Sequence, residues 1–211
     1  MKTDTLIDML ARGAGPAPRA LAARRLSPAA LAGLLLSAAA AVAVFGAIPS
    51  GMFATTVPWL KMAYAAALAL AAGWLTARLS RPAAALATPR LVVIAVVGVM
   101  LAVGAVSFFA APAGARLQAL LGHSWLSCPW NVLALSFPAL AASLWSVRGL
   151  APTRPRAAGF SAGLMAGSVG AFGYALACPE ASAAFVAVWY TLGIALTGAA
   201  GALLGPKVLQ W

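Results

Sequence analysis

The feature that most constrains this chain is a series of long apolar stretches separated by short connectors. A helix needs roughly 20 apolar residues to cross a bilayer core of about 30 Å, because its backbone polar groups must bond within the segment where water is absent. Six stretches meet this requirement: 26–47, 58–77, 91–111, 128–147, 157–177 and 183–204. The sequence therefore predicts an all-α bundle of six transmembrane helices over residues 26–211, preceded by an N-terminal segment of residues 1–25.

The charged residues support this class and predict an orientation. Only 8% of the 211 residues are charged, whereas a soluble domain carries about 25%. The 14 basic residues outnumber the 3 acidic ones, and they separate the apolar stretches instead of forming a cluster that would bind nucleic acid. Assigning connectors to alternate sides leaves only Lys61 and Arg116, two of the 14, opposite the chain ends. By the positive-inside rule, both termini are predicted to be cytoplasmic.

The remaining ionisable residues argue against catalysis and cation transport. The acidic residues are Asp4, Asp8 and Glu180, and none is predicted at membrane depth, where pumps and exchangers usually hold one. Lys61 is expected near an interface, with its ammonium group reaching the headgroups. A single histidine and no carboxylate pair leave no set of groups for acid–base catalysis. We expect no enzyme activity and no resident cofactor, and a small-solute transporter or channel is the alternative function.

The two cysteines occur in similar contexts at the predicted outer ends of neighbouring stretches. Cys128 precedes Pro129 where the fourth stretch begins, and Cys178 precedes Pro179 where the fifth ends. The predicted topology places both at one depth, facing an oxidising compartment. Cys128 is also expected in the first turn of a helix, where unpaired backbone amides favour a thiolate. The pattern alone fits a structural disulfide as well as a sensor.

His123 and Glu180 are candidate accessory ligands near the cysteines. Together with Cys128 and Cys178 they could coordinate a soft or borderline heavy-metal ion transiently. Each also has a simpler interpretation, because His123 suits an interfacial polar position and Glu180 can keep a short outer loop hydrated. The pattern leaves both interpretations open.

The N-terminal segment contains a short amphipathic pattern. Leu6, Ile7 and Leu10 would share one face of a helix, while Asp4 and Asp8 would share another. A helix of this length is marginal in water, but it could order by laying its apolar face in a partner's groove. A frayed tail or a helix lying on lipid fits the same pattern.

Small residues recur every four positions in the last two stretches. They are Gly159, Gly163 and Gly167 in the fifth stretch, and Gly193, Thr197, Gly201 and Gly205 in the sixth. Such stripes let helix backbones approach closely. We expect them to pack within the bundle, with a homodimer as the weaker alternative.

Six runs of sequence together carry a family resemblance. They are TDTLIDMLA at 3–11, LGHSWLSCP at 121–129, LAPTRP at 150–155, YALACPE at 174–180, and WYTLGIAL at 189–196 followed by GPKVLQW at 205–211. These runs resemble the NrsF family of bacterial anti-sigma factors, and the likeness extends nearly end to end.

This resemblance implies a negative regulator that holds an extracytoplasmic-function sigma factor at the bacterial inner membrane and releases it under heavy-metal or oxidative stress. It implies that Cys128 and Cys178 are the sensing residues. The expected partners are then the sigma factor and the lipid bilayer, without direct contact to nucleic acid. The surface expected to bind the sigma factor is formed by Asp4, Leu6, Ile7, Asp8 and Leu10.

Overall fold

A computed structural model of the chain describes residues 3–13, 21–81 and 84–209. These residues form helices and connecting turns, and no strand occurs among them, so the predicted all-α class is confirmed. The long helices are α2 (Leu21–Phe45), α3 (Thr56–Leu79), α4 (Ala87–Ala110), α6 (Cys128–Arg148), α7 (Pro155–Ala175) and α9 (Thr191–Val208). The short elements are α1 (Thr3–Gly13), η1 (Ser50–Ala54), η2 (Ala113–Ala115), α5 (Arg116–Leu121), α8 (Ala183–Phe185) and the π-helical turn η3 (Val186–Tyr190).

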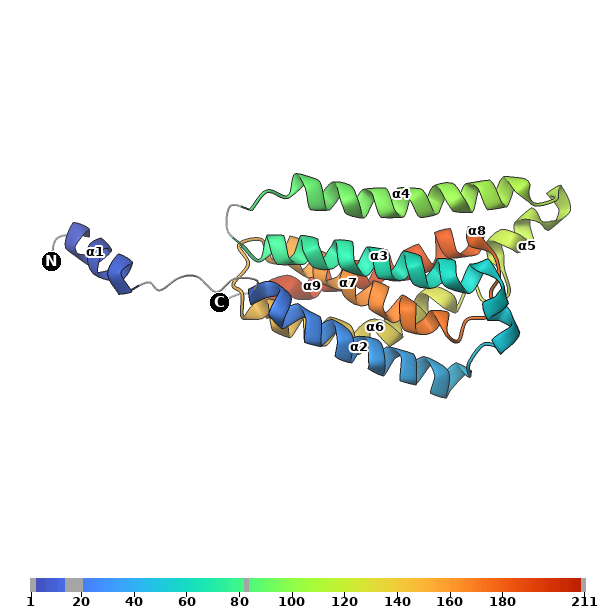
Figure 1. The fold of residues 1–211 in the computed structure, drawn as a ribbon, viewed down its shortest axis with the longest axis horizontal. Coiled ribbons are helices and arrows are strands. Elements are labelled where there is room, and N and C mark those ends of the chain that lie inside the picture. The colour runs from blue at the N-terminus through green and yellow to red at the C-terminus, as the bar shows by residue number, and fades with distance from the viewer. Residues whose placement is uncertain (1–2, 14–20, 82–83, 210–211) are drawn as a thin grey trace.

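The long helices lie side by side and run alternately in opposite directions, so their termini gather at two ends of a bundle (Figure 1). We call the end that holds Cys128, Cys178 and Glu180 the cysteine end, and the opposite end the arginine end. The basic residues described at the arginine end are Arg24, Arg25, Arg78, Arg81, Arg90, Arg148, Arg154, Arg156 and Lys207. Lys2 and Arg19, which the charge count assigns to the same side, lie outside the described residues.

Five helices are long and apolar enough to cross a membrane: α2, α3, α4, α6 and the continuous helix Ala183–Val208, which combines α8, η3 and α9. Large apolar side chains such as Leu35, Val106 and Phe137 are exposed on the outside of the bundle. An exposed apolar surface of this extent is suited to lipid, because soluble monomers rarely expose large contiguous apolar patches. Five of the six expected spans thus coincide with apolar helices of sufficient length.

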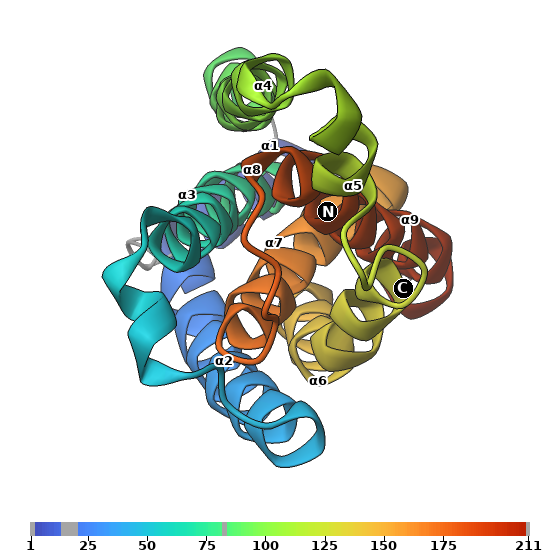
Figure 2. The same cartoon turned by 90° about the vertical axis from the view of Figure 1, so that its right-hand side faces the viewer.

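Helix α7, which corresponds to the remaining expected span, occupies the centre of the bundle. It contacts α2, α3, α6 and α9 (Figure 2), and most of its residues are buried. Because protein surrounds α7, its surface can be built from glycine and other small residues that let the neighbouring helices approach. Its 21 residues have a length of about 30 Å at 1.5 Å per residue, which matches the hydrocarbon core.

The small-residue stripes account for the close packing of α7 on α9. A Cβ atom added at Gly159 would overlap the carbonyl of Gly201, and one added at Gly163 would overlap the carbonyl of Thr197. Only glycine permits backbones to approach this closely. The stripes therefore pack within the chain as expected, and the homodimer stays a prediction.

Candidate functional site

Cys128 and Cys178 come together at the cysteine end. Cys128 is the first residue of α6, and Cys178 lies three residues beyond the end of α7. Both side chains are 0% exposed and belong to one core cluster, and both are free thiols. The Lys61 ammonium group contacts the backbone carbonyl of Cys178, and Glu180 contacts the turn that precedes Cys128. The fold thus brings together two cysteines that are distant in sequence.

The start of α6 differs from the expected open helix terminus. The N–H of Cys128 donates to the carbonyl oxygen of Ser124 at 2.8 Å, because the turn before α6 continues into the helix. The expectation of an unpaired amide at Cys128 is therefore wrong. The amide of Cys128 is paired because the chain before α6 forms a turn, and that turn supplies the carbonyl oxygen of Ser124 as an acceptor.

A buried lysine lies beside the cysteines. The side chain of Lys61 is 0% exposed, and its Nζ donates to the carbonyl oxygen of Cys178 at 2.8 Å. The same Nζ lies 5.9 Å from the centroid of the Tyr190 ring. The expectation that Lys61 extends to the headgroups is wrong, because the helix face that carries it is turned toward the core. Lys61 instead joins α3 to the chain segment after α7.

Two tyrosines complete this cluster. The rings of Tyr174 and Tyr190 lie with centroids 5.9 Å apart, and the hydroxyl of Tyr174 accepts a hydrogen bond from Asn131 Nδ2 at 3.2 Å. Tyr190 is fully buried, and its hydroxyl has no hydrogen-bond partner within the described part of the chain. Tyr190 also ends the π-helical turn η3, a distortion frequently found at functional sites.

Glu180 connects the two cysteine-bearing segments. Its Oε1 accepts hydrogen bonds from the backbone N–H of His123 at 2.7 Å, and from both the N–H and the hydroxyl of Ser124 at 3.0 Å each. Glu180 is only 7% exposed. It therefore holds the turn before α6 against the segment after α7, instead of simply hydrating a loop.

The predicted accessory metal ligands have different surroundings. His123 is exposed and reaches Glu180 through its backbone, while Glu180 is occupied by backbone and hydroxyl donors. Across residues 3–13, 21–81 and 84–209, no group of three or more His, Cys, Asp or Glu side chains is arranged to hold a metal ion. Metal ligation by these residues stays a prediction.

The predicted output segment forms a helix at the opposite end of the molecule. Helix α1 lies beyond the arginine end, apart from the bundle (Figure 1). Its apolar side chains are uncovered, with Leu6 42%, Ile7 57% and Leu10 66% exposed. Asp8 pairs with Arg12 at 3.2 Å, but an exposed pair of this kind stabilises a helix only slightly. An amphipathic helix with an exposed apolar face is typical of a segment that binds a partner.

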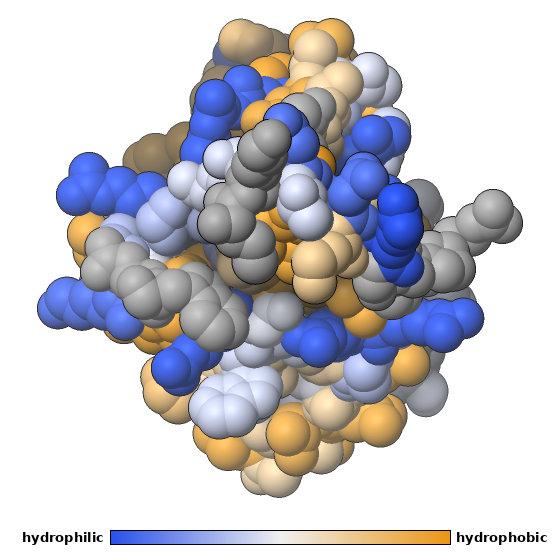
Figure 3. Space-filling model, turned by 90° about the vertical axis from the view of Figure 1, so that its left-hand side faces the viewer, coloured by the Kyte–Doolittle hydropathy of each residue, from blue (hydrophilic) through white to orange (hydrophobic). Residues whose placement is uncertain are grey.

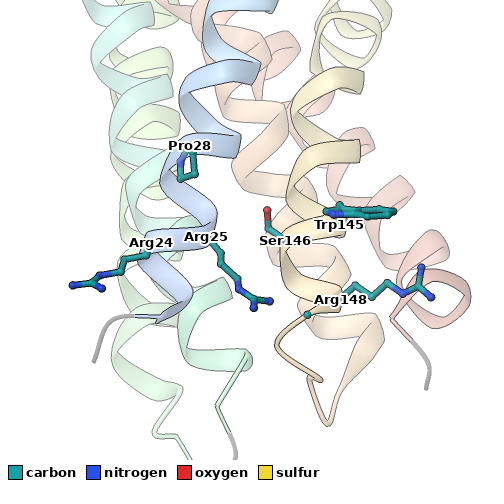
Figure 4. Close-up of a pocket in the computed structure, with 7 residues that line it drawn as sticks. Arg24, Arg25, Pro28, Trp145, Ser146 and Arg148 are labelled. Carbon is teal, nitrogen blue, oxygen red and sulfur yellow. The ribbon is translucent and has the colours of Figure 1, made fainter. Parts of the chain in front are cut away.

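A second surface lies at the arginine end, where hydrophilic side chains gather around the face (Figure 3). A cavity of about 780 Å³ opens between α2 and α6 and is lined by Arg25, Trp145 and Arg148, among others. Arg25 points toward α6, whereas Arg24 and Arg148 point to opposite sides (Figure 4). The guanidinium of Arg25 lies against Gly149, where α6 ends. This basic face lies at the same end as α1 and is the other candidate surface for a partner.

These features define a multi-pass helical membrane protein with a buried thiol cluster at one end and an uncovered amphipathic helix at the other. The family described as negative regulator of sigma F, NrsF, matches residues 10–211, and the chain belongs to this family. The predicted family resemblance is therefore confirmed.

Two full-length relatives agree with this assignment. The chain is 39% identical over 214 residues to a probable anti-sigma-F factor NrsF of Azospira oryzae, and 38% identical over 222 residues to an anti-sigma-F factor NrsF of Caulobacter vibrioides. Each alignment covers 100% of both chains. No solved structure matches the chain. Because the family is regulatory and not enzymatic, the prediction that the chain is not an enzyme is confirmed.

Lys61, Tyr174 and Tyr190 are the residues of this cluster that sequence reasoning did not select as site residues. A signal for Lys61 was available, since a single lysine within an apolar stretch is by default a candidate functional residue. Tyr190 carried no comparable signal, because aromatic residues are common in membrane helices. Its place beside Lys61 depends on how α3 and η3 pack.

Proposed function

We propose that this protein is a transmembrane anti-sigma factor that holds an extracytoplasmic-function sigma factor at the bacterial inner membrane. The observation that carries the proposal is the full-length likeness to two anti-sigma-F factors, whose names state the sigma factor as their target. The uncovered α1 supports it, because a regulator of this class needs a surface that is free to bind a partner.

The proposed output surface is α1. Leu6, Ile7 and Leu10 would lie in an apolar groove of the sigma factor, and the carboxylates of Asp4 and Asp8 would meet basic residues at its rim. The existing Asp8–Arg12 pair does not prevent this, because both side chains are largely exposed. Docking would cover apolar side chains that have no partner within the bundle.

The proposed input site is the thiol pair, which reacts with a heavy metal or an oxidant. The segment that carries Cys178 is held from two sides, by Lys61 and by the N–H of Ile48, which donates to the carbonyl oxygen of Leu176 at 2.9 Å. Drawing the two sulfurs together would shift the ends of α6 and α7. Both helices are stiff and are joined by residues 149–154 at the arginine end, so a shift at the cysteine end would reach the side of α1.

The proposal includes α7 as a sixth span and both termini in the cytoplasm. We expect a reporter fused after Trp211 to be active only if it functions in the cytoplasm, and one inserted in the connector after Ala110 only if it functions in the periplasm. The reason is the retention of arginine-rich ends on the cytoplasmic side. Fluorescence of a cytoplasm-dependent protein and activity of a periplasm-dependent phosphatase measure the two positions. A phosphatase that is active after Trp211 would overturn the cytoplasmic C-terminus, and the result after Ala110 would show whether the orientation or the number of spans is wrong.

Cell fractionation tests the function itself. With the full chain present, we expect most of the cognate sigma factor to sediment with the membranes, because the anchor removes it from solution. Addition of an inducing metal or oxidant is expected to move it into the soluble fraction and to raise target transcription. A sigma factor that stays soluble when the full chain is present in the membrane would contradict the proposal.

A small-solute transporter or channel is the alternative function, and buried Lys61 is the observation that favours it. However, the Lys61 ammonium is engaged by the carbonyl of Cys178 and by the ring of Tyr190. These contacts suit a residue that holds helices together better than one that lines a water-filled path. The anti-sigma function therefore accounts for more of the molecule.

A further inference from the structure

A cavity of about 470 Å³ lies beside the thiol pair at the cysteine end. Its walls are the end of α2, the turn before α6 and the chain after α7. Ser127, which precedes Cys128, lines it, and so do Ala177 and Pro179, which flank Cys178. We call it the access cavity. Each buried cysteine is therefore adjacent in sequence to a residue of the cavity wall.

Among the residues that the structure describes, the lining of the access cavity is mostly apolar and carries no charged side chain. Hydroxyl groups come from Ser124, Ser127 and Tyr174, and an amide comes from Asn131. Ala47 and Ser127 are exposed on its rim, so the mouth opens at the cysteine end of the bundle. A small uncharged molecule can enter such a lining at little cost in desolvation, whereas an ion would lose its water without gaining a countercharge.

A hydrogen bond between two residues that line the cavity joins α6 to α7. Asn131 Nδ2 donates to the Tyr174 hydroxyl at 3.2 Å. Asn131 lies one helical turn after Cys128, and the backbone N–H of Cys178 donates to the carbonyl oxygen of Tyr174 at 2.9 Å. Each partner of the bond is thus attached to one of the cysteine-bearing segments.

We propose that the access cavity is the route by which a small, uncharged solute reaches the two thiols, and that the Asn131–Tyr174 hydrogen bond is the contact that closes it. This inference rests on the proposed thiol input and adds to it a route and a class of solute, namely an uncharged oxidant or an uncharged metal complex instead of a free metal ion. Opening the contact separates α6 from α7 where the buried cysteines meet, so solute arrival and helix displacement are parts of one event.

The test measures the rate at which thiol reagents modify the purified full chain, with intact mass counting adducts on its 2 cysteines. The probes are neutral methyl methanethiosulfonate and its cationic trimethylammonium and anionic sulfonate analogues. We expect the neutral reagent to react about tenfold faster than either charged one, corresponding to about 1.4 kcal/mol. Equal rates for all three, after correction for their rates with a free thiol, would overturn the proposed class of solute.

Matched substitutions test the route. Ala47→Trp fills the mouth of the cavity and is expected to slow modification by the neutral reagent about tenfold, whereas Ala54→Trp, at an exposed position outside the cavity at the same end, is expected to leave it unchanged. Asn131→Ala removes the closing hydrogen bond and is expected to speed modification about fivefold, since such a bond contributes about 1 kcal/mol. Equal rates for the two tryptophan variants would overturn the route.

Two further measurements keep the test decisive. Ser127→Phe blocks the cavity from the opposite wall and replaces Ala47→Trp if that variant does not accumulate in the membrane. Fractionation of the sigma factor after modification separates this inference from the proposed function. If the rates follow the expected pattern but the modified chain still retains the sigma factor, the route stands and the thiol input fails.

Discussion

Changing Leu6 and Leu10 to serine is expected to abolish repression and to raise target transcription to the level of cells without the protein. Both side chains are exposed on α1, so the substitutions leave the packing of the bundle unchanged. Burying a leucine contributes about 1.5–3 kcal/mol, so losing two would weaken binding of the sigma factor at least about 100-fold. Co-isolation of the sigma factor with the membrane protein and transcription of a target promoter measure the effect.

A matched pair of substitutions on the same helix is the control for this experiment. Thr5→Ala with Arg12→Lys alters exposed positions on the side of α1 opposite Leu6 and Leu10, and we expect it to repress normally. Deletion of residues 3–11 is expected to act like the leucine variant, with the chain still inserted in the membrane. Repression that persists after the deletion would move the interaction to the connectors around Arg81 or Arg154.

Replacing Cys128 or Cys178 by serine is expected to abolish induction while basal repression is retained. The thiols lie at the opposite end of the bundle from α1, so the output surface is untouched. Loss of either sulfur removes both a two-thiolate metal site and a disulfide. Target transcription with and without metal or oxidant measures induction, and membrane abundance measures folding. Normal induction in the double variant would refute the sensor hypothesis.

The burial of both cysteines makes the control for this experiment important. A serine hydroxyl without a partner in a buried site costs about 1–3 kcal/mol, so alanine substitutions at Cys128 and Cys178 accompany the serine ones. Ala177→Ser introduces a hydroxyl next to Cys178 without removing a thiol and is expected to be induced normally. A purely structural pair predicts something else, namely lower abundance and higher basal transcription in every cysteine variant.

The substitution Lys61→Met tests whether the contact between Lys61 and the Cys178 backbone is part of the signal. This substitution preserves an apolar stem of similar length but removes the hydrogen bond to the Cys178 carbonyl. If displacement of the Cys178 segment is the signal, target transcription in the variant is expected to rise in the absence of metal or oxidant. Unchanged basal transcription, at normal abundance, would mean that the Lys61 contact only stabilises the fold.

Much of the architecture could be predicted from local properties of the sequence. Each apolar stretch forms a helix because backbone groups in lipid must bond within their own segment, and this requirement does not depend on the neighbouring helices. The same reasoning placed Cys128 and Cys178 at one end of the bundle, since strict alternation of direction determines which termini meet. The amphipathic pattern of α1 and the small-residue stripe of α7 are likewise local signals.

Tertiary packing decided what those signals left open. The helical period shows which residues share a face, but the rotation of α3 about its axis depends on contacts with α7 and η3, which lie far away in sequence. Lys61 therefore looked like an interfacial lysine and proved to be buried against Cys178 and Tyr190. The paired amide of Cys128, the bridging role of Glu180 and the access cavity arise in the same way. Each depends on two segments meeting across the bundle, and only packing determines which segments meet.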